Sequence, residues 1–414
     1  MKVLWLVNLT LPEPAKALGF GNNPVGGWLI GQREQLKHSV SLVICSIDAR
    51  VKKSEFLTIE GVDYAVLPTG SREEFSALLQ NAQPDLVHLW GSENPAAPAL
   101  VSLCSPERIL LSAQGIMTPY TEHLLDGVPE KYCRSSPLQK LATVIDRGEL
   151  LDRELAFYQE QSKKEAALLA GLRHVTGRTP WDKAELALLA PHAAYYVCNE
   201  TLRPGFFSAR WQGGPQKPVL FLSQGNQPRK GLHWLLQALP PVLEKYPDLT
   251  LHIAGWPMVK KGPLLEPLLR LLLPYQTYLK KLIRKYHLEK QVVWLGCLNE
   301  ADMRAALLQS SIFVMPSSLE NSPNSLGEAM LLGMPCIATD AGGTAGMLTN
   351  GKEGILYAPE DVPALTAAIL SLLDDPAKAR RYGDAARERA LVTHDPVRNG
   401  QAMLKIYRTI LKEE

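Results

Sequence analysis

The chain has 414 residues, of which 46% are hydrophobic and 21% charged, and its formal net charge is +2 at pH 7. This length is too great for one comfortable hydrophobic core and predicts two domains of roughly two hundred residues each. The near balance of charge argues against overall affinity for nucleic acid, and no apolar run approaches the roughly 20 residues that span a bilayer. The composition therefore predicts a soluble globular protein without a nucleic-acid partner.

The residues 1–7 at the N-terminus are apolar but are soon followed by Pro12 and Pro14, without a cleavage pattern of small residues. We therefore expect a first strand there rather than an export signal. The six cysteines lack Cys-x-x-Cys spacing, which favours buried thiols in a reducing cytosol and predicts no zinc site. The expected location is cytoplasmic.

Short apolar strands alternate with helical patterns along the chain, which is typical of doubly wound parallel sheets. The first set of predicted strands comprises residues 3–7, 42–47, 64–67, 86–89, 109–112, 174–176 and 194–197. The second set comprises residues 219–222, 251–254, 292–295, 312–315, 336–338 and 355–357. A stretch rich in glycine and proline, 203–215, separates the sets.

The predicted fold class is therefore α/β, with two Rossmann-like parallel-sheet domains. We expect a first domain at 1–209 and a second at 210–393. The last periodic stretch, 394–414, has no strand to pair with and is predicted to be a helix that crosses back to the first domain.

Two carboxylates, Glu320 and Glu328, flank an amide-rich turn after the predicted strand 312–315. Pro316 ends that strand, and a helix is predicted to begin at Ser325 and to end at Gly333. In open α/β sheets, ligands lie beyond the carboxyl ends of the strands, where a helix N-terminus favours an anion. The turn therefore predicts an anionic ligand.

The backbone N–H groups of Asn324, Ser325 and Leu326 are predicted to contact a phosphate of that ligand. Glu320 and Glu328 would bond hydroxyl groups on either side of it, a pattern that fits a nucleotide sugar. In the alternative interpretation, Glu328 only closes a capping box with Ser325 and Glu320 is a solvated loop acid.

Two doubly wound domains with this paired-Glu loop in the second resemble the GT-B glycosyltransferases, in particular the large retaining family 4 (glycosyltransferase group 1). The resemblance is carried by residues 318–330, 177–182 and 112–115, and it extends over nearly the whole chain. Within the family, these stretches are similar to those of bacterial enzymes of capsular, exopolysaccharide or lipopolysaccharide assembly.

The resemblance implies two domains facing a central cleft and transfer of a sugar from a nucleotide donor, such as a UDP- or GDP-sugar. The acceptor implied is a glycan or a lipid-linked glycan. The family's roles assign contact with the donor sugar to Glu320 and a bond to the nucleotide ribose to Glu328. The donor base and sugar, the acceptor, the linkage and the oligomeric state stay open.

A departing diphosphate needs cations or amides, because negative charge builds on the leaving oxygen. Arg229 and Lys230 follow the predicted strand 219–222 and open a helical run, where a cation without a bound anion would oppose the helix dipole. We therefore predict that Lys230 contacts the diphosphate. The family usually has an arginine at the position of Gly225, and whether Arg229 replaces it stays open.

In the first domain, Gly26 and Gly27 follow the first strand and match the glycine loop of the family, which approaches the donor. Gln114 and Gly115 end another strand, where the family often carries His-Gly. Because an amide does not titrate, Gln114 would orient a reacting group rather than take its proton.

Three further side chains are candidates for the acceptor or the cleft: Glu93, Arg178 and Asn199. Glu93 has an equally weighted alternative as a helix-start carboxylate, and Asn199 as part of a hinge. The guanidinium of Arg178 precedes a predicted cap at Thr179 and could meet a phosphate or a carboxylate. His88 lies within a strand and is interpreted as a core histidine.

The chain has no Asp-x-Asp sequence, the usual binding site for a divalent ion on a diphosphate, so metal-independent transfer without a resident cofactor is predicted.

Residues 259–290 are locally basic with interleaved leucines, which suggests an amphipathic helix for peripheral contact with anionic lipid. The alternative is a helix packed on its own domain. Two rival functions are a non-catalytic nucleotide-sugar-binding subunit and a sugar-nucleotide epimerase.

Overall fold

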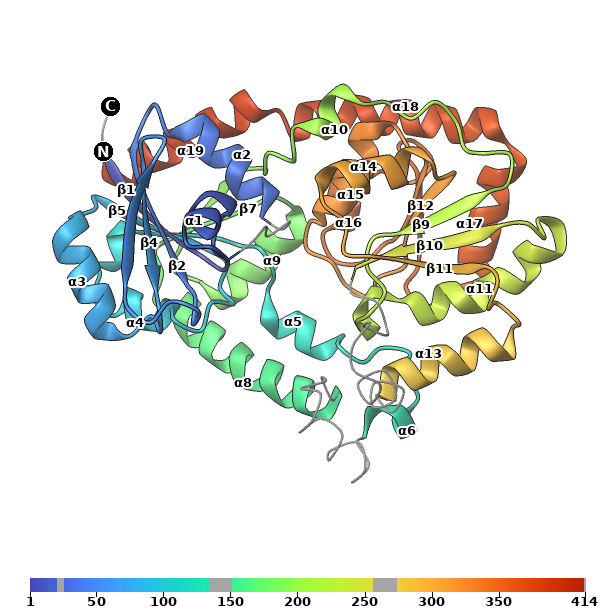
Figure 1. Ribbon diagram of the computed structural model, residues 1–414, viewed down its shortest axis with the longest axis horizontal. Coiled ribbons are helices and arrows are strands. Elements are labelled where there is room, and N and C mark those ends of the chain that lie inside the picture. Colours follow the sequence, from blue (N-terminus) through green and yellow to red (C-terminus); the bar gives the residue numbers. More distant parts are fainter. Residues whose placement is uncertain (21–25, 135–150, 256–273, 413–414) are drawn as a thin grey trace. The chain divides into compact units, whose positions relative to one another are not determined.

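The computed structural model describes residues 1–20, 26–134, 151–255 and 274–412. The chain divides into two compact units, and each is built around its own sheet (Figure 1). The first unit comprises Met1–Thr118, Gln161–Pro204 and Thr393–Glu414, and the second comprises Pro119–Glu160 and Gly205–Val392. The predicted fold class of two α/β parallel-sheet domains is confirmed.

Residues 119–160 are assigned to the first domain by their place in the sequence, but in the structure they belong to the second unit. The chain passes into the second unit within helix α5 (Met117–Glu122) and returns within helix α8 (Leu151–Ala170). The physical reason is burial, because Val128 and Leu151 join the hydrophobic core of the second unit. The first domain is therefore discontinuous in sequence.

The first sheet has eight strands in the order β3-β4-β2-β1-β5-β6-β7-β8. Neighbouring strands in this sheet are parallel except for β3 and β4, which form an antiparallel hairpin at one edge. The sequence did not predict β3. The strands are β1 (Lys2–Val7), β2 (Ser41–Ile47), β3 (Glu55–Ile59), β4 (Val62–Leu67), β5 (Leu86–Trp90), β6 (Ile109–Ser112), β7 (His174–Gly177) and β8 (Ala194–Val197).

Besides parts of α5 and α8, seven helical segments accompany this sheet in the described part of the chain. They are α1 (Pro12–Ala17), α2 (Gly27–Leu36), α3 (Arg72–Ala82), α4 (Ala97–Val101), the 3-10 turn η1 (Pro106–Arg108), α9 (Pro180–Leu189) and α19 (Pro396–Leu411).

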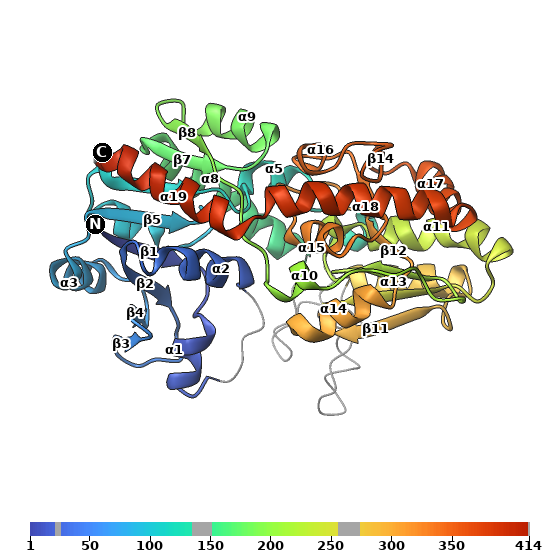
Figure 2. The ribbon, with the colours of Figure 1, turned by 90° about the horizontal axis from the view of Figure 1, so that it is seen from above.

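The C-terminal helix α19 packs along α2 within the first unit (Figure 2). Its Tyr407 hydroxyl accepts a hydrogen bond from Trp5 Nε1 at 3.0 Å and lies 2.7 Å from His88 Nδ1. His88 Nε2 is 2.7 Å from Ser112 Oγ, and burial lowers the pKa of His88 to about 3. His88 is therefore a neutral, fully hydrogen-bonded core residue, as the sequence predicted.

The second sheet has six strands, all parallel, in the order β11-β10-β9-β12-β13-β14. The strands are β9 (Val219–Leu222), β10 (Thr250–Ala254), β11 (Val292–Gly296), β12 (Ile312–Met315), β13 (Cys336–Thr339) and β14 (Ile355–Tyr357). The helical segments described in this unit are α6 (Glu130–Cys133), α10 (Gly205–Ser208), the 3-10 turn η2 (Pro228–Lys230), α11 (Leu232–Lys245), α13 (Pro274–Lys285), α14 (Glu300–Leu308), α15 (Asn324–Leu332), α16 (Thr344–Met347), α17 (Val362–Asp374) and α18 (Pro376–Thr393).

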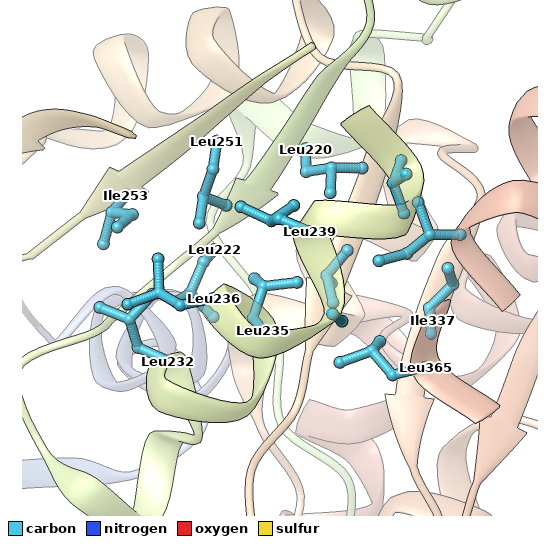
Figure 3. Close-up of a cluster of buried hydrophobic side chains, with 14 of the residues drawn as sticks. Leu220, Leu222, Leu232, Leu235, Leu236, Leu239, Leu251, Ile253, Ile337 and Leu365 are labelled. Carbon is cyan, nitrogen blue, oxygen red and sulfur yellow. The ribbon is translucent and has the colours of Figure 1, made fainter. Parts of the chain in front are cut away.

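Helix α11 supplies the centre of the second core. Its leucines recur at helical spacing, so one apolar stripe faces the sheet. Figure 3 shows these side chains packed against residues of β9, β10, β13 and α17, namely Leu220, Leu222, Leu232, Leu235, Leu236, Leu239, Leu251, Ile253, Ile337 and Leu365. Each buried leucine contributes about 1.5–3 kcal/mol of transfer free energy, which fixes the start of α11 and the loop before it.

The described part of the basic segment, 274–290, contains α13. Tyr275, Leu279 and Leu282 on one face of α13 are buried in the core of the second unit, while Lys281 and Lys285 are exposed. The apolar face of α13 is therefore packed on its own domain, as in the alternative interpretation, and is not available to lipid. The rest of the predicted amphipathic helix, 259–273, lies outside the described residues. Over the ranges that the structure covers, we find no helix with the length and apolarity needed to cross a membrane.

Candidate active site

A cluster of three charged side chains lies at the carboxyl edge of the second sheet. β9 and β12 are neighbouring parallel strands, so the segments that follow them meet at one edge. Turn η2 after β9 carries Arg229 and Lys230, and the loop after β12 carries Glu320. Lys230 Nζ lies 2.6 Å from Glu320 Oε1, and Arg229 Nη1 lies 3.6 Å from Glu320 Oε2. The structure thus brings these three predicted residues together.

Arg229 and Glu320 are buried and Lys230 is largely so, and within the cluster two cations face one carboxylate. Glu154 of α8 also exerts an electrostatic attraction on Arg229. Burial acts to raise the pKa of Glu320, but the charges of Lys230 and Arg229 outweigh it and hold this pKa below its usual value. Burial lowers the pKa of Lys230, and the attraction of Glu320 opposes this effect. Two cations beside one carboxylate are a suitable place for a further anion.

The backbone around Glu320 is fixed by neighbouring loops. Gly343 N–H donates to the Glu320 carbonyl at 2.8 Å, and Arg229 Nη1 donates to the Leu319 carbonyl at 2.9 Å. Ser318 N–H donates to the Arg229 carbonyl at 2.8 Å, which ties η2 directly to the loop after β12. The carboxylate of Glu320 is therefore preorganised beside both cations.

Gly231 allows this close approach. Its φ is +72°, in the left-handed region, and a Cβ at this position would overlap the Pro316 carbonyl oxygen at the end of β12. The sequence predicted that Arg229 and Lys230 open the helix. Instead they form η2, and α11 begins after this glycine at Leu232.

We expect Gly231→Ala to destabilise the second unit and to weaken nucleotide binding. The left-handed backbone alone costs roughly 1–2 kcal/mol, and the overlap with Pro316 adds to it. Urea unfolding and nucleoside-diphosphate titration measure the two effects. The matched control is Gly351→Ala, since Gly351 has φ +76° but open space around its Cβ position. Equal losses in the two variants would contradict the role of the overlap.

Gly225 stands where the family usually has arginine, and the structure shows little room there. A Cβ at this position would lie 2.8 Å from Leu232 Cδ2 and 2.9 Å from Ile253 Cγ2. Both neighbours belong to the core of the unit. The cations of the described cluster are Arg229 and Lys230, and the role of Arg229 as the substitute stays a hypothesis.

Helix α15 differs at its start from the predicted capping box. The helix begins at Asn324 with Pro323 as N-cap, and no side chain caps it, so Ser325 and Glu328 do not form the box. Leu326 N–H donates to the Pro323 carbonyl at 3.1 Å, which satisfies one of the three amides predicted to contact phosphate. Its end at Gly333, with φ +76°, is as predicted. Glu328 is buried within α15.

A second group of predicted residues meets at the carboxyl edge of the first sheet. Gln114, Arg178 and Glu200 follow the adjacent strands β6, β7 and β8. Gln114 Nε2 donates to Glu200 Oε1 at 2.5 Å, and Arg178 Nη1 lies 2.7 Å from Glu200 Oε2, with both charged side chains only 6% exposed. The guanidinium of Arg178 thus meets a carboxylate. Glu200 follows Asn199 at the end of a predicted strand, where a hinge role and ligand contact were equally open, but its pairing with Arg178 was not predicted.

These residues line a small pocket together with Trp90, Thr176 and Asn199, with a volume of about 10 Å³, or roughly one water molecule. Trp90 Nε1, Thr176 Oγ1 and Arg178 Nε are buried and have no hydrogen-bond partner among the residues that the structure describes. The pocket therefore offers unused donors beside Gln114. Arg178 is itself placed by α9, whose Thr179 and Asp182 form the predicted cap.

Glu93 and Gly115 lie near a third buried carboxylate, Glu165 of α8. Glu165 accepts hydrogen bonds from Ser92 Oγ at 2.5 Å and from Met117 N–H at 3.0 Å, and Ser92 Oγ is also 3.3 Å from the Gly115 carbonyl. Burial, together with the charge of Glu165, raises the pKa of Glu93 to about 7. Glu165 was not anticipated from the sequence, because its burial depends on this tertiary contact.

The raised pKa of Glu93 predicts a pH-dependent loss of stability. Because the folded state holds a proton that the unfolded chain releases, the contribution of Glu93 to the free energy of unfolding is greatest below about pH 4.5 and is lost as the pH rises towards 7. The fall is at most about 3 kcal/mol. Unfolding titrations from pH 4.5 to 7.5 should show a shallower fall in Glu93→Gln than in the parent, and parallel curves would contradict the assignment.

Gly26 and Gly27 stand at the start of α2, where Gly26 has φ +92°. A Cβ at Gly26 would lie 2.8 Å from Leu9 Cδ1, and one at Gly27 would overlap the side chain of Arg203. These glycines therefore permit close packing within the first unit. Residues 23–25 of the predicted loop lie outside the described residues, and the approach to a donor stays a prediction.

No group of three or more His, Cys, Asp or Glu side chains that could hold a metal ion occurs within residues 1–20, 26–134, 151–255 and 274–412. The charged clusters described above each combine carboxylates with Arg or Lys, or with hydrogen-bond donors. The chemistry that they offer is binding of anions and hydroxyl groups.

The chain is similar to known glycosyltransferases in sequence. Residues 208–389 match the family model described as "Glycosyl transferases group 1". Glycogen synthase from Mycobacterium tuberculosis is 30% identical over 212 residues, which cover 50% of this chain and 47% of that protein. The chain thus spans about half the length of the curated relatives it matches.

Two solved structures align over nearly the whole chain. Sucrose-phosphate synthase from Thermosynechococcus elongatus has a TM-score of 0.73 and 17% identity, covering 100% of this chain and 99% of that one. HepE from Anabaena, crystallised in complex with UDP-glucose, has a TM-score of 0.64 and 17% identity, with coverage of 99% and 100%. At these identities the likeness is one of fold. The chain therefore has the GT-B fold, and its residues 208–389 match the glycosyl transferases of group 1.

Proposed function

We propose that this protein is a retaining glycosyltransferase that moves a sugar from a nucleotide-sugar donor to a glycan or lipid-linked acceptor. The observation that carries the proposal is the cluster of Arg229, Lys230 and Glu320, in which two cations face one carboxylate, and which lies within the segment that matches the family model. Residues 318–330 resemble the corresponding stretch of bacterial enzymes that assemble surface polysaccharides, which supports surface polysaccharide synthesis as the process in which this protein acts. This process implies a cytoplasmic enzyme.

On the donor side, Lys230 and Arg229 would neutralise the diphosphate as the bond between the sugar and the phosphate breaks. Glu320 would bind hydroxyl groups of the donor sugar, and Glu328 would bind the ribose. The N-terminal amides of α15, at Asn324 and Ser325, would favour a phosphate through the helix dipole. A UDP- or GDP-sugar has the chemical groups that this set requires.

On the acceptor side, Gln114 would orient a hydroxyl group of the acceptor without taking its proton. In this mechanism the acceptor approaches the sugar from the same face as the departing phosphate, so the anomeric configuration is retained. The bond between the anomeric carbon and the phosphate oxygen breaks, that oxygen takes the proton of the acceptor hydroxyl, and the acceptor oxygen bonds to the anomeric carbon. Glu93, Gly115, Arg178 and Asn199 would contribute to binding the acceptor. Contact with a membrane surface, if the acceptor is lipid-linked, would involve exposed cations such as Lys281 and Lys285.

A thermal-shift panel of nucleotide sugars followed by measurement of nucleoside-diphosphate release tests the proposal. We expect stabilisation by at least one donor and release that depends on an acceptor. The rival function of a non-catalytic binding subunit is motivated by Gly225 and Gln114 at positions where the family usually has Arg and His. Binding of a donor without release would favour that rival, and conversion of the donor alone to an isomeric sugar nucleotide would identify an epimerase.

We expect turnover to persist after removal of divalent cations. The physical reason is that Lys230 and Arg229 can supply the positive charge that a metal ion gives to a diphosphate in other transferases. Release of nucleoside diphosphate in excess EDTA should stay within about twofold of the rate without it, since no metal-dependent binding energy is lost. A strict requirement for magnesium or manganese would refute metal independence while leaving the transferase proposal in place.

A further inference from the structure

The second unit includes Pro119–Glu160 from the first half of the chain, of which 119–134 and 151–160 are described. Residues 120–123 of this segment contact the charged cluster and its loop. Part of this segment is anchored in the core through Val128. Tyr132 stacks on Tyr278 of α13, with ring centroids 5.0 Å apart. Gly127 has φ +69°, and a Cβ there would lie 2.5 Å from His233 Nε2 of α11. The segment is therefore an integral part of this unit.

Tyr120 of this segment lies directly on the charged cluster. The guanidinium carbon of Arg229 is 4.1 Å from the centre of the Tyr120 ring. The Tyr120 hydroxyl accepts a hydrogen bond from the backbone N–H of Asn321 at 3.3 Å. One side chain thus contacts both η2 and the loop that carries Glu320.

A neighbouring backbone contact holds the same loop. Ser318 Oγ donates to the His123 carbonyl at 3.1 Å. The segment therefore contacts the loop after β12 at two positions, on either side of Leu319 and Glu320.

The ring has a specific effect on Arg229. A guanidinium is planar, and stacking on an aromatic face fixes its plane at small entropic cost. The ion pair of Arg229 with Glu320 is long, at 3.6 Å, and leaves its Nε without a hydrogen-bond partner among the described residues. Arg229 Nη1 also donates to the Leu319 carbonyl at 2.9 Å, but this bond and the salt bridge both use the same nitrogen. The ring of Tyr120 adds a restraint on the plane of the guanidinium.

We propose that Tyr120 is a positioning residue that holds the Arg229 guanidinium in place to bind the β-phosphate of a nucleoside diphosphate. The inference rests on the proposed function, because it requires the diphosphate to bind at this cluster. It assigns a role in the donor site to a residue from the opposite half of the sequence.

The test compares two classes of ligand, nucleoside diphosphates and nucleoside monophosphates, on the 414-residue chain. Dissociation constants are measured by calorimetry for UDP, GDP and ADP and for the corresponding monophosphates, which lack the β-phosphate. In Tyr120→Leu, we expect the preference for diphosphate over monophosphate to fall by about 3- to 30-fold, the range that corresponds to a partly buried cation–π contact. Tyr120→Phe keeps the ring and should restore the preference to within about threefold.

The matched control is Tyr132→Leu, which removes an aromatic stack from the same segment away from Arg229. A merely structural role for Tyr120 would weaken binding of both ligands equally and leave the preference unchanged, which would overturn the inference. An equal fall in Tyr132→Leu would also overturn it. If Tyr120→Leu does not fold, Tyr120→Met gives the same comparison, because Met also lacks an aromatic ring and its longer, flexible side chain can fill the space differently.

The outcome separates this inference from the proposed function. If the parent protein binds no nucleoside diphosphate, the donor site itself is wrong and both proposals fail. If the parent binds a diphosphate and Tyr120→Leu has the parent's preference, only the role of Tyr120 fails.

Discussion

Replacing Glu320 by Gln is expected to lower the rate of sugar transfer by about 100- to 1,000-fold, the usual loss when one preorganised electrostatic group is removed from an active site. The substitution keeps the shape of the side chain and removes its negative charge. In the structure this charge lies 2.6 Å from Lys230 Nζ and is held below its usual pKa by the two cations. An uncharged amide cannot give the same stabilisation to positive charge on the donor sugar.

The affinity of Glu320→Gln for nucleoside diphosphate should be at least that of the parent. In the free protein Glu320 competes with the ligand for Lys230 and Arg229, and the variant removes this competition. It also removes the carboxylate that both cations face, which costs up to about 3–5 kcal/mol of stability. A bound diphosphate should restore much of that loss, so the ligand-induced thermal shift should be larger in the variant than in the parent.

The control for this prediction is Glu353→Gln. Glu353 is also a buried carboxylate of the second unit, 3.4 Å from Arg389 Nη1, but it lies outside the cluster. Its substitution should leave the transfer rate within about threefold of the parent, since only a partly exposed ion pair is lost. A Glu320→Gln variant that transfers sugar at the parent's rate would show that the site is misassigned.

The strands of both sheets were predictable where the apolar run is continuous. Ile312–Met315 and Val219–Leu222 are buried along their whole length, and their bounds agree with the prediction. Strand β3 was missed because Glu55–Ile59 is partly exposed at a sheet edge, and its apolar residues Phe56, Leu57 and Ile59 neither alternate with polar ones nor form a continuous run. Its hairpin turn uses Glu60 and Gly61, both with positive φ, and Glu-Gly is a weak turn signal.

The start of α15 shows a limit of local capping rules. Ser325 and Glu328 have the spacing of a capping box with Ser325 as N-cap, but the N-cap is Pro323, two residues earlier. The Pro323 carbonyl accepts the N–H groups of Leu326 and Gly327, so the first turn is closed by backbone alone. A spacing rule cannot foresee this, because it depends on the direction in which the loop arrives.

The partners of the site residues were the least predictable part. Sequence patterns place Gln114, Arg178 and Asn199 at strand ends, but they do not show that Glu200 joins the first two. Likewise, no local signal indicates that Tyr120 packs on Arg229, since the two residues are far apart in the chain and meet only through the tertiary fold. The apolar pattern of the sequence predicts which site residues lie at the ends of strands. Which of these residues contact one another depends on the packing of the whole fold.

The pair formed by Arg178 and Glu200 leads to the second large expected effect, which concerns the first unit. Both side chains are 6% exposed, so removing one partner leaves a buried charge without compensation. Glu200→Leu is therefore expected to lose about 3–5 kcal/mol of stability, measured by urea unfolding. Because Glu200 also accepts the hydrogen bond from Gln114, the variant should lose transfer activity as well.

The double variant Arg178→Met/Glu200→Leu separates charge from packing. If the loss in the single variant comes from the isolated guanidinium, removing that group as well should recover most of the stability, since apolar side chains of similar volume replace buried ion pairs at little cost. Activity should not recover, because Gln114 still lacks its acceptor. A double variant that is as unstable as the sum of the two single variants would contradict this account and would instead indicate a packing defect at the carboxyl edge of the first sheet.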